Sequence, residues 1–199
     1  MPRAPGQVDK HKSEAILQAA SDLFVEKGAG ASMAEIARRA GVSKQTLYNR
    51  FPSKTEIGRA LAARRSDAVT APLRVHDAPE TVLAAFAEAM ITKIGEGQRG
   101  ASLRGVALMS PVAPDLAAAI YDAGPGESLR RLASWLAEQD RLGVLAVPDP
   151  AHAAEMFSGM TLGHGHLRAI LGVPQPPIAD VRARAHEITR RFFRAFAVD

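Results

Sequence analysis

Apolar residues recur at steps of three and four along most of the chain, which is the spacing of an amphipathic α-helix. The first apolar face consists of Ile16, Leu17, Ala20, Leu23 and Phe24. It predicts a helix over about residues 10–27, ended by Gly28, because glycine readily adopts the left-handed conformation that closes a helix. No segment shows the strict alternation of a strand bounded by turn residues. The pattern therefore predicts an all-α fold of about nine helices.

Capping residues divide residues 32–70 into three further helices. Ser32 and Glu35 form a capping box, in which each side chain satisfies a backbone N–H left free at the helix start. Ser43 is placed to cap the next helix, and Ser53 with Glu56 forms a second capping box. The predicted helices span about 33–39, 44–50 and 53–70.

The remaining helices follow the same periodicity with less regular breaks. They are expected around Leu83–Ile94, over about 101–109 and 114–141, between Asp149 and Leu171, and over about 178–197. The sequence Gly124-Pro125-Gly126 should kink or split the long helix, because proline removes a backbone donor and clashes with the preceding turn. Pro174–Pro177 separates the last two helices.

Composition and charge narrow the classes of function. The 199 residues are 47% apolar and 23% charged, as in ordinary globular proteins, and the absence of Cys excludes disulfides, thiolate metal clusters and a cysteine nucleophile. Residues 1–66 hold 12 Lys and Arg against 6 Asp and Glu, a net +6, whereas residues 67–199 hold 13 against 15. A basic front favours a polyanion partner. With no signal peptide or long apolar run, we expect a cytoplasmic protein with no membrane partner.

The segment from Met33 to Leu47 has the spacing of a helix-turn-helix. Ala37 lets the second helix cross close to the first, and Gly41 permits a positive φ in the turn. Val42 and Leu47 are spaced to bury the seam between the two helices. These positions predict that residues 44–50 form a recognition helix.

The outward face of that helix carries groups suited to DNA. On a helical wheel Gln45, Tyr48 and Asn49 point away from Leu47, and Lys44 and Thr46 flank them. Gln and Asn can each bridge adenine through two hydrogen bonds in the major groove. Tyr48 and Lys54 suit phosphate oxygens, together with the free N–H groups at the start of the fourth helix. The alternative interpretation is an ordinary solvated helix face.

These residues resemble the TetR family of bacterial transcriptional regulators. The resemblance covers about residues 10–60 and is carried by Ile16–Ala20, Leu23-Phe24, Gly28, Ser32–Ala37, Ala40–Lys44, Thr46–Tyr48, Phe51 and Ser53-Lys54. It implies a helix-turn-helix domain over 1–52, a connecting helix over 53–70, and an effector-binding and dimerisation domain over 71–199. It also implies a homodimer on a palindromic double-stranded DNA operator, released by an unidentified small-molecule effector.

One departure from the family pattern affects the expected DNA contacts. Many members have an aromatic residue and then His after the tyrosine, where this chain has Asn49-Arg50. Arg50 can replace the histidine as a phosphate contact, and Asn49 can add base readout. The expected DNA-binding set is Ser43, Lys44, Gln45, Thr46, Tyr48, Asn49, Arg50 and Lys54, with Arg3, Lys10 and Lys12 as further phosphate candidates.

The larger domain offers candidates for an effector site and a dimer interface. Methionine fills irregular apolar space, and small-molecule sites between helices are apolar with few polar groups. The effector candidates are Phe86, Met90, Met160 and His164, although the apolar ones are also suited to the core. The interface candidates are Gly159, Gly163, Val181, Ile188, Phe192 and Phe196. The stripe on the last helix is also suited to pack inward, and the family resemblance favours the interface.

Other motifs are weaker candidates. Residues 95–100 fit G-x-G-x-x-G, the fingerprint of a nucleotide-dependent oxidoreductase, but that motif requires a strand before it and here follows a predicted helix. His164 and His166, even with His152, lack the spacing of metal ligands on one helix face. We therefore expect no metal, no cofactor and no catalytic residues. The expected function is a ligand-responsive repressor; an activator or an effector-independent regulator would use the same domain.

Overall fold

The computed structural model describes residues 5–95 and 97–198, and within them the regular elements are helices and no strand occurs. The α-helices are α1 (Pro5–Lys27), α2 (Met33–Arg39), α3 (Lys44–Arg50), α4 (Lys54–Val69), α5 (Pro79–Gly95), α6 (Gly97–Met109), α7 (Pro114–Ala123), α8 (Pro125–Arg141), α9 (Pro150–Leu162), α10 (Gly165–Leu171) and α11 (Val181–Ala195). Short 3-10 turns follow α1 (η1, Gly28–Gly30) and α4 (η2, Ala71–Arg74). The predicted all-α class is confirmed.

Two hydrophobic cores divide the molecule. The smaller core joins α1–α3 to the start of α4 and contains Ile16, Ala20, Leu23, Ala31, Ile36, Ala37, Leu47 and Ile57. The larger core joins α5, α8, α9 and α11, with Phe86, Phe157 and Phe192 at its centre and Val69 at the end of α4 beside it. Phe157 meets Phe192 edge-on, with ring centroids 5.1 Å apart. The helix α4 therefore contributes to both cores.

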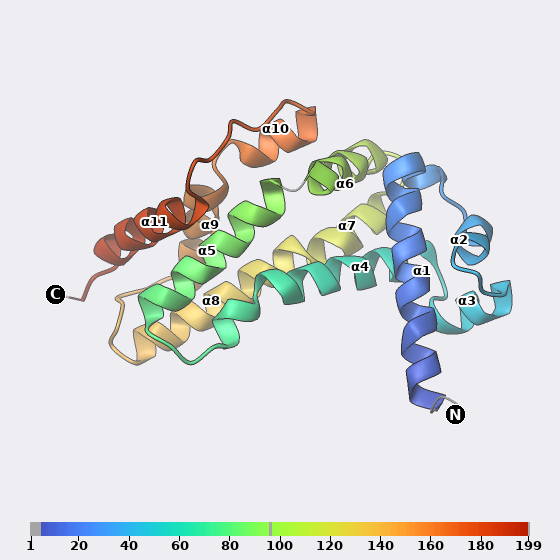
Figure 1. The fold of residues 1–199 in the computed structure, drawn as a ribbon. Coiled ribbons are helices and arrows are strands. Elements are labelled where there is room, and N and C mark those ends of the chain that lie inside the picture. The colour runs from blue at the N-terminus through green and yellow to red at the C-terminus, as the bar shows by residue number, and fades with distance from the viewer. Residues whose placement is uncertain (1–4, 96, 199) are drawn as a thin grey trace.

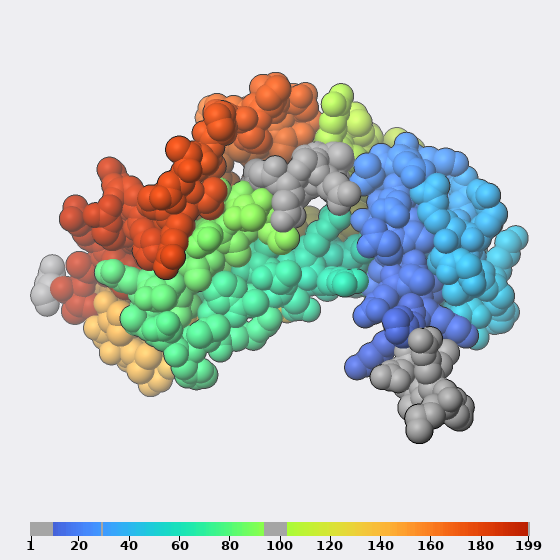
Figure 2. Space-filling view, viewed as in Figure 1, coloured from blue at the N-terminus to red at the C-terminus, as the bar shows by residue number. Residues whose placement is uncertain are grey.

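The small core forms a lobe at one end of the molecule. In Figure 1, α1, α2 and α3 (blue) lie at one end, and α4 runs from them along α7 and α8 towards the far end, where α11 and the C-terminus lie. Figure 2 shows the same lobe standing out from the larger helical body. The helices α1–α3 of the basic front third thus lie in this lobe, whereas α4, which completes the front third, runs along the larger body.

The helix boundaries agree with the sequence pattern in the first lobe and differ later. The expected helices over 33–39 and 44–50 have those bounds, and the expected break at Gly124 divides α7 from α8. The single helix expected between Asp149 and Leu171 is two helices, which corrects the sequence prediction. Gly163 has φ +46°, so the chain leaves α9 in a conformation that residues with a side chain rarely adopt.

Glycines hold α4 close to α7. A Cβ at Gly58 would lie 2.7 Å from Leu116 Cδ1, and a Cβ at Gly124 would lie 2.9 Å from the Ile120 carbonyl oxygen and 3.2 Å from Ala62 Cβ. Neither position has room for a larger side chain without movement of its neighbours. The helix that leaves the small lobe is therefore packed tightly against the large one.

Candidate DNA interface and effector cavity

The connection between α2 and α3 is a tight turn. Gly41 adopts φ +65°, and the Val42 N–H donates to the Ala37 carbonyl oxygen over 3.0 Å. Ser43 then caps α3, its Oγ accepting from the Thr46 N–H at 3.0 Å. This local chemistry aims α3 outward from the lobe, as the helix-turn-helix spacing predicts.

The recognition helix has one buried side and one exposed side. Leu47 is fully buried in the small core, whereas Lys44, Gln45, Tyr48 and Asn49 are exposed, and Tyr48 retains 48% of its accessible surface. Gln45 Nε2 donates to Asn49 Oδ1 at 2.7 Å, one turn further along. Thr46 is half-buried beside the Ser43 cap. The side chains predicted to read bases are thus brought together on one exposed face.

The basic candidates are less uniform. Arg50 is half-buried, and its Nη1 donates to Ser13 Oγ at 2.8 Å, so this side chain ties the end of α3 to α1. Lys54 is the first residue of α4, after the Ser53 cap, and is half-buried. Lys10 and Lys12 are exposed on α1, and Arg3 lies outside the described residues.

Ion pairs join α2 to the end of α1. Lys27 pairs with Glu35, and Arg39 Nη1 lies 2.5 Å from Glu26 Oε1. Glu35 also accepts from the Ser32 N–H at 3.0 Å, which completes the capping box. The Lys27 hydrogen bond, followed by those from Ser32, lowers the pKa of Glu35 from 4.5 to about 2. These pairs orient the helix that precedes the turn.

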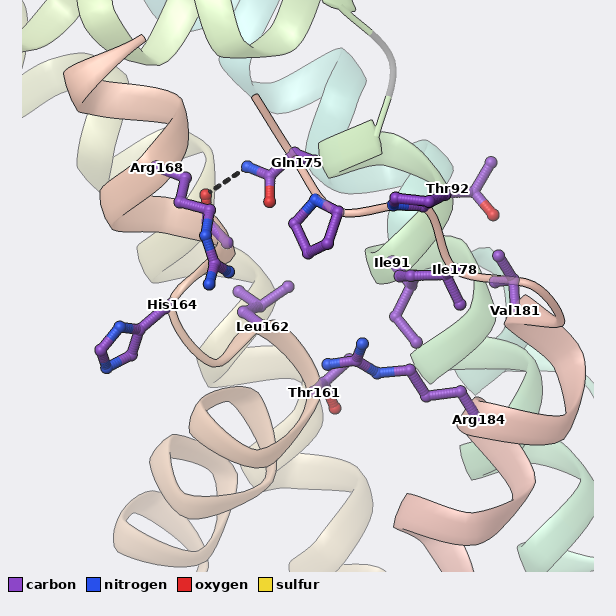
Figure 3. Close-up of a pocket in the computed structure, with 13 residues that line it drawn as sticks. Ile91, Thr92, Thr161, Leu162, His164, Arg168, Gln175, Ile178, Val181 and Arg184 are labelled. Carbon is purple, nitrogen blue, oxygen red and sulfur yellow. Dashed lines mark hydrogen bonds between the residues drawn. The ribbon is translucent and has the colours of Figure 1, made fainter. Parts of the chain in front are cut away.

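A cavity of about 530 Å³ lies in the larger lobe between α5, α9, α10 and α11. Its described lining consists of Ile91, Thr92, Thr161, Leu162, His164, Gly165, Arg168, Gln175, Pro176, Pro177, Ile178, Val181 and Arg184. Figure 3 shows Arg168 and Arg184 reaching in from different helices on either side of Leu162. The Gln175 amide donates to the Gly165 carbonyl oxygen at 2.7 Å and anchors the proline-rich connector.

Of the four predicted effector residues, one borders this cavity and the other three lie elsewhere. His164 borders the cavity, with its ring extending outward in Figure 3. Phe86 is fully buried in the large core and Met90 packs against that core, so neither lines this cavity. Met160 is 38% exposed on α9 and does not line it. The sequence pattern could not separate core residues from cavity-lining residues. It also missed Arg168 and Arg184, and the one sequence feature that could have pointed to them is that they flank the Pro174–Pro177 connector.

The stripe on α11 packs inward, which corrects its assignment to a partner surface. Phe192 is fully buried, Ile188 is 9% exposed, and Phe196 packs against the same core. Val181 lines the cavity. These side chains cover α5 and α9 within one chain, because an amphipathic helix first buries its apolar face where a core is available. Of the predicted interface set, Gly159 and Gly163 remain exposed.

A different apolar surface remains open to solvent on α9 and α10. Met156 and Met160 lie one turn apart on α9, at helical spacing from Gly159 and Gly163. The α10 segment adds Leu167, Ile170 and Leu171, all exposed. We call these seven residues the α9–α10 face. Exposed large apolar side chains of this kind are candidates for an interaction site.

The glycine-rich and histidine motifs of the sequence do not form a cofactor or metal site within the described residues. The glycine motif at 95–100 runs from the last residue of α5 into the first turn of α6, with Glu96 outside the described residues. A helix thus stands before it, where a dinucleotide fingerprint requires a strand. Within the described part of the chain no three His, Asp or Glu side chains gather as metal ligands. No described helix is long and apolar enough to cross a membrane.

Comparison with known families agrees with this architecture. The sequence model described as bacterial regulatory proteins, tetR family, matches residues 16–61, and that of the AefR-like transcriptional repressor C-terminal domain matches residues 81–198. The chain belongs to the TetR family of DNA-binding transcriptional regulators. Proteins of this class bind DNA and act as dimers with small-molecule ligands.

Individual relatives resemble the chain to different extents. The structure of the flavonoid-responsive regulator FrrA is 31% identical, with a TM-score of 0.72, over 92% of this chain and 96% of FrrA. The structure of a TetR-family regulator from Mesorhizobium loti is 24% identical, with a TM-score of 0.75, over 96% of this chain and 98% of that protein. The transcriptional activator FasR of Mycolicibacterium smegmatis is 47% identical over 60 residues, which span 30% of this chain and 27% of FasR.

Proposed function

We propose that the protein is a homodimeric, ligand-responsive repressor that binds a palindromic operator and is released by a small-molecule effector. The observation that carries this proposal is the exposed face of α3, where Gln45, Tyr48 and Asn49 point outward from a capped helix whose opposite side is buried. Such a face fits the major groove, because Gln and Asn side chains match the hydrogen-bonding edge of adenine. The division into residues 1–52, 53–70 and 71–199 belongs to this proposal, as does a cytoplasmic location at the nucleoid.

The DNA contacts are proposed in two groups. Lys44, Gln45, Thr46, Tyr48 and Asn49 enter the major groove, with Ser43 setting the start of their helix. Lys54 and the exposed lysines of α1 meet phosphates. Arg50, at the end of α3, holds this helix to α1 through Ser13 and is proposed as a further phosphate contact.

The dimer interface is proposed on the α9–α10 face. Gly159 and Gly163 allow a partner helix to approach closely, while Met156, Met160 and Leu167 supply apolar area. A two-fold dimer would present two α3 helices to half-sites about 34 Å apart, one turn of DNA. An effector bound in the cavity beside α5 would change that spacing through α4, and release would follow.

Selection of binding sites from random double-stranded DNA at physiological salt tests the proposal. We expect enrichment of one sequence with two-fold symmetry, since a symmetric dimer reads two copies of the same half-site. The matched control is the Gln45→Ala, Asn49→Ala double variant, which should lose the enrichment and keep weak, salt-sensitive binding. Equal retention of all sequences by the unaltered protein would contradict sequence-specific regulation.

Activation is a second candidate, favoured by one observation. The relative with 47% identity in the DNA-binding region, FasR, is an activator. An activator would use the same DNA contacts at a different promoter position. Transcription from a promoter carrying the selected site, measured with purified RNA polymerase, separates the two: a fall on adding the protein supports the repressor and a rise supports the activator.

A further inference from the structure

Two arginines in the cavity have no acidic partner among the residues that the structure describes. Arg168 is half-buried on α10 and Arg184 is exposed on α11, and among the described residues neither lies within salt-bridge distance of a carboxylate. Other arginines of the larger lobe do pair: Arg190 and Arg191 on α11 share Glu187, and Arg141 on α8 meets Glu138. The cavity therefore concentrates positive charge that the described protein leaves unbalanced.

The rest of the described lining is apolar or already hydrogen-bonded, apart from Thr92 and from His164, whose ring extends outward in Figure 3. Ile91, Leu162 and Ile178 contribute hydrocarbon, with Val181 and the prolines of the connector beside them. Thr161 donates its hydroxyl to the Phe157 carbonyl oxygen at 2.8 Å, so its proton is not available to a ligand. None of the described lining residues is Asp or Glu. A matching ligand needs one small anionic group on an apolar body.

We propose that the cavity binds an amphipathic carboxylate, with Arg168 and Arg184 on its carboxylate and the apolar lining around its hydrocarbon. This rests on the proposed function, in which the cavity holds the effector. A guanidinium presents parallel N–H donors that match the two oxygens of a carboxylate. Guanidinium groups also match a phosphate, so a phosphate on the same apolar body is the competing ligand class that the experiment must separate. A volume of about 530 Å³ is within the range of small-ligand sites.

The two arginines also give the ligand a mechanical role. They belong to α10 and α11, which are separated along the chain by the connector, and Ile91 on the opposite wall belongs to α5. A carboxylate held by both guanidinium groups would join α10 to α11, while its hydrocarbon contacts α5. Since α5 packs against the end of α4, the ligand would bear on the helix that leads to the DNA-binding lobe.

Isothermal titration of the full-length protein with two carboxylates and their neutral amides tests the proposal. The probes are octanoate with octanamide, 4-phenylbutanoate with 4-phenylbutanamide, and octyl phosphate as the competing anion. We expect at least one carboxylate to bind about tenfold or more tightly than its amide, because hydrogen bonds to charged groups are the stronger ones. Equal binding of acid and amide in both pairs, no binding by either acid, or tighter binding of octyl phosphate would overturn it.

Arginine variants locate the effect. Arg168→Gln and Arg184→Gln should each weaken the carboxylate about tenfold and leave the amide unchanged. Arg182→Gln is the matched control, because it removes the same charge from an exposed position of α11 outside the cavity, and it should bind like the unaltered protein. An equal loss in the control would mean that general charge, not the cavity, attracts the ligand, and would overturn the assignment.

Operator affinity measured in the same samples distinguishes failure of the carboxylate assignment from failure of the proposed ligand-responsive regulation. If a carboxylate binds through the arginines and operator affinity is unchanged, the ligand class is supported and the proposed ligand response is contradicted. Release from the operator by a neutral compound, with no carboxylate binding, would keep the ligand-responsive regulator and overturn the carboxylate.

Discussion

Gln45 and Asn49 are hydrogen-bonded to each other across one turn of α3, so each helps to hold the other at the exposed face. This pairing preorganises two amide groups where a base edge would meet them, and it also means that their contributions should not be additive. Lys54 lies at the start of α4 and is expected to contact phosphate, which carries no sequence information. The two kinds of contact therefore predict different responses to mutation.

Gln45→Ala or Asn49→Ala should cost about 1–3 kcal/mol of binding at particular base pairs and relax specificity there. Lys54→Ala should weaken binding to every sequence and reduce the salt dependence. Titration of the selected site and its single-base variants at several salt concentrations measures both effects. Arg194→Ala, an exposed charge at the far end of the molecule, is the control and should change neither. A uniform loss from all the α3 and α4 substitutions would contradict the assignment.

Glu35 gives the small lobe a pH dependence. Its pKa is lowered to about 2, chiefly by the Lys27 hydrogen bond, so the ionised carboxylate favours the folded state above about pH 4.5 and loses that effect as the pH falls towards 2. Glu35→Gln should lower the melting temperature at pH 6 and reduce the further fall between pH 6 and pH 3. Thermal unfolding followed by circular dichroism measures this. Glu14→Gln, at an exposed position of α1, should keep the full fall; an unchanged pH profile in Glu35→Gln would refute the role of this carboxylate.

Among the helices, the α4–α7 contact depends on the absence of side chains. At Gly124, which ends α7, an added Cβ would lie 3.2 Å from Ala62 Cβ of α4 and 2.9 Å from the Ile120 carbonyl oxygen of α7 itself, and backbone atoms cannot move aside as a side-chain end can. The end of α4 is also tied to α8, because Arg131 Nη1 lies 2.6 Å from Asp67 Oδ1 and 3.0 Å from Thr70 Oγ1. These contacts make α4 part of the large lobe along most of its length.

Gly124→Ala should therefore destabilise the protein by about 1–3 kcal/mol, the usual cost of overpacking. Urea unfolding at constant protein concentration measures the free energy. Gly105→Ala is the control, since a Cβ at this position of α6 would lie 3.8 Å from its nearest contact, the Phe24 carbonyl oxygen of α1, and alanine there should be neutral or stabilise by about 1 kcal/mol. Equal stability of the two variants would contradict the close packing around Gly124, against Ile120 of α7 and Ala62 of α4.

Dimerisation is a property of the whole molecule. Because the apolar stripe of α11 faces inward, substitutions in that stripe cannot test the dimer interface. Phe192→Glu would place a charge in the core, so loss of a dimer in that variant would report unfolding. The double substitution Met156→Glu, Met160→Glu changes two exposed side chains of the α9–α10 face instead, and it should yield folded monomers with weak operator binding. Analytical ultracentrifugation measures the mass. Leu142→Glu, at an exposed apolar position after α8, should remain dimeric; a dimeric methionine variant would exclude this face.

The first lobe was predictable from sequence because its signals are local. A capping serine, a glycine turn and an apolar step of three or four residues each act within a few positions, so α2, α3 and the outward Gln45, Tyr48 and Asn49 follow from the pattern. The residue types on that face also indicated DNA. The pattern located the α7–α8 break for the same reason, since Gly124 and Pro125 interrupt a helix wherever they occur.

The larger lobe depends on contacts between segments that are far apart in the chain. Whether the α11 stripe meets a partner or α5, and whether Met160 lines a cavity or faces solvent, is decided by how these helices pack, and periodicity is the same in either case. Arg168 and Arg184 share a cavity because α10 and α11 converge on α5, although a connector separates them in sequence. Helical faces are local properties, but the neighbour that covers each face is set by the fold as a whole.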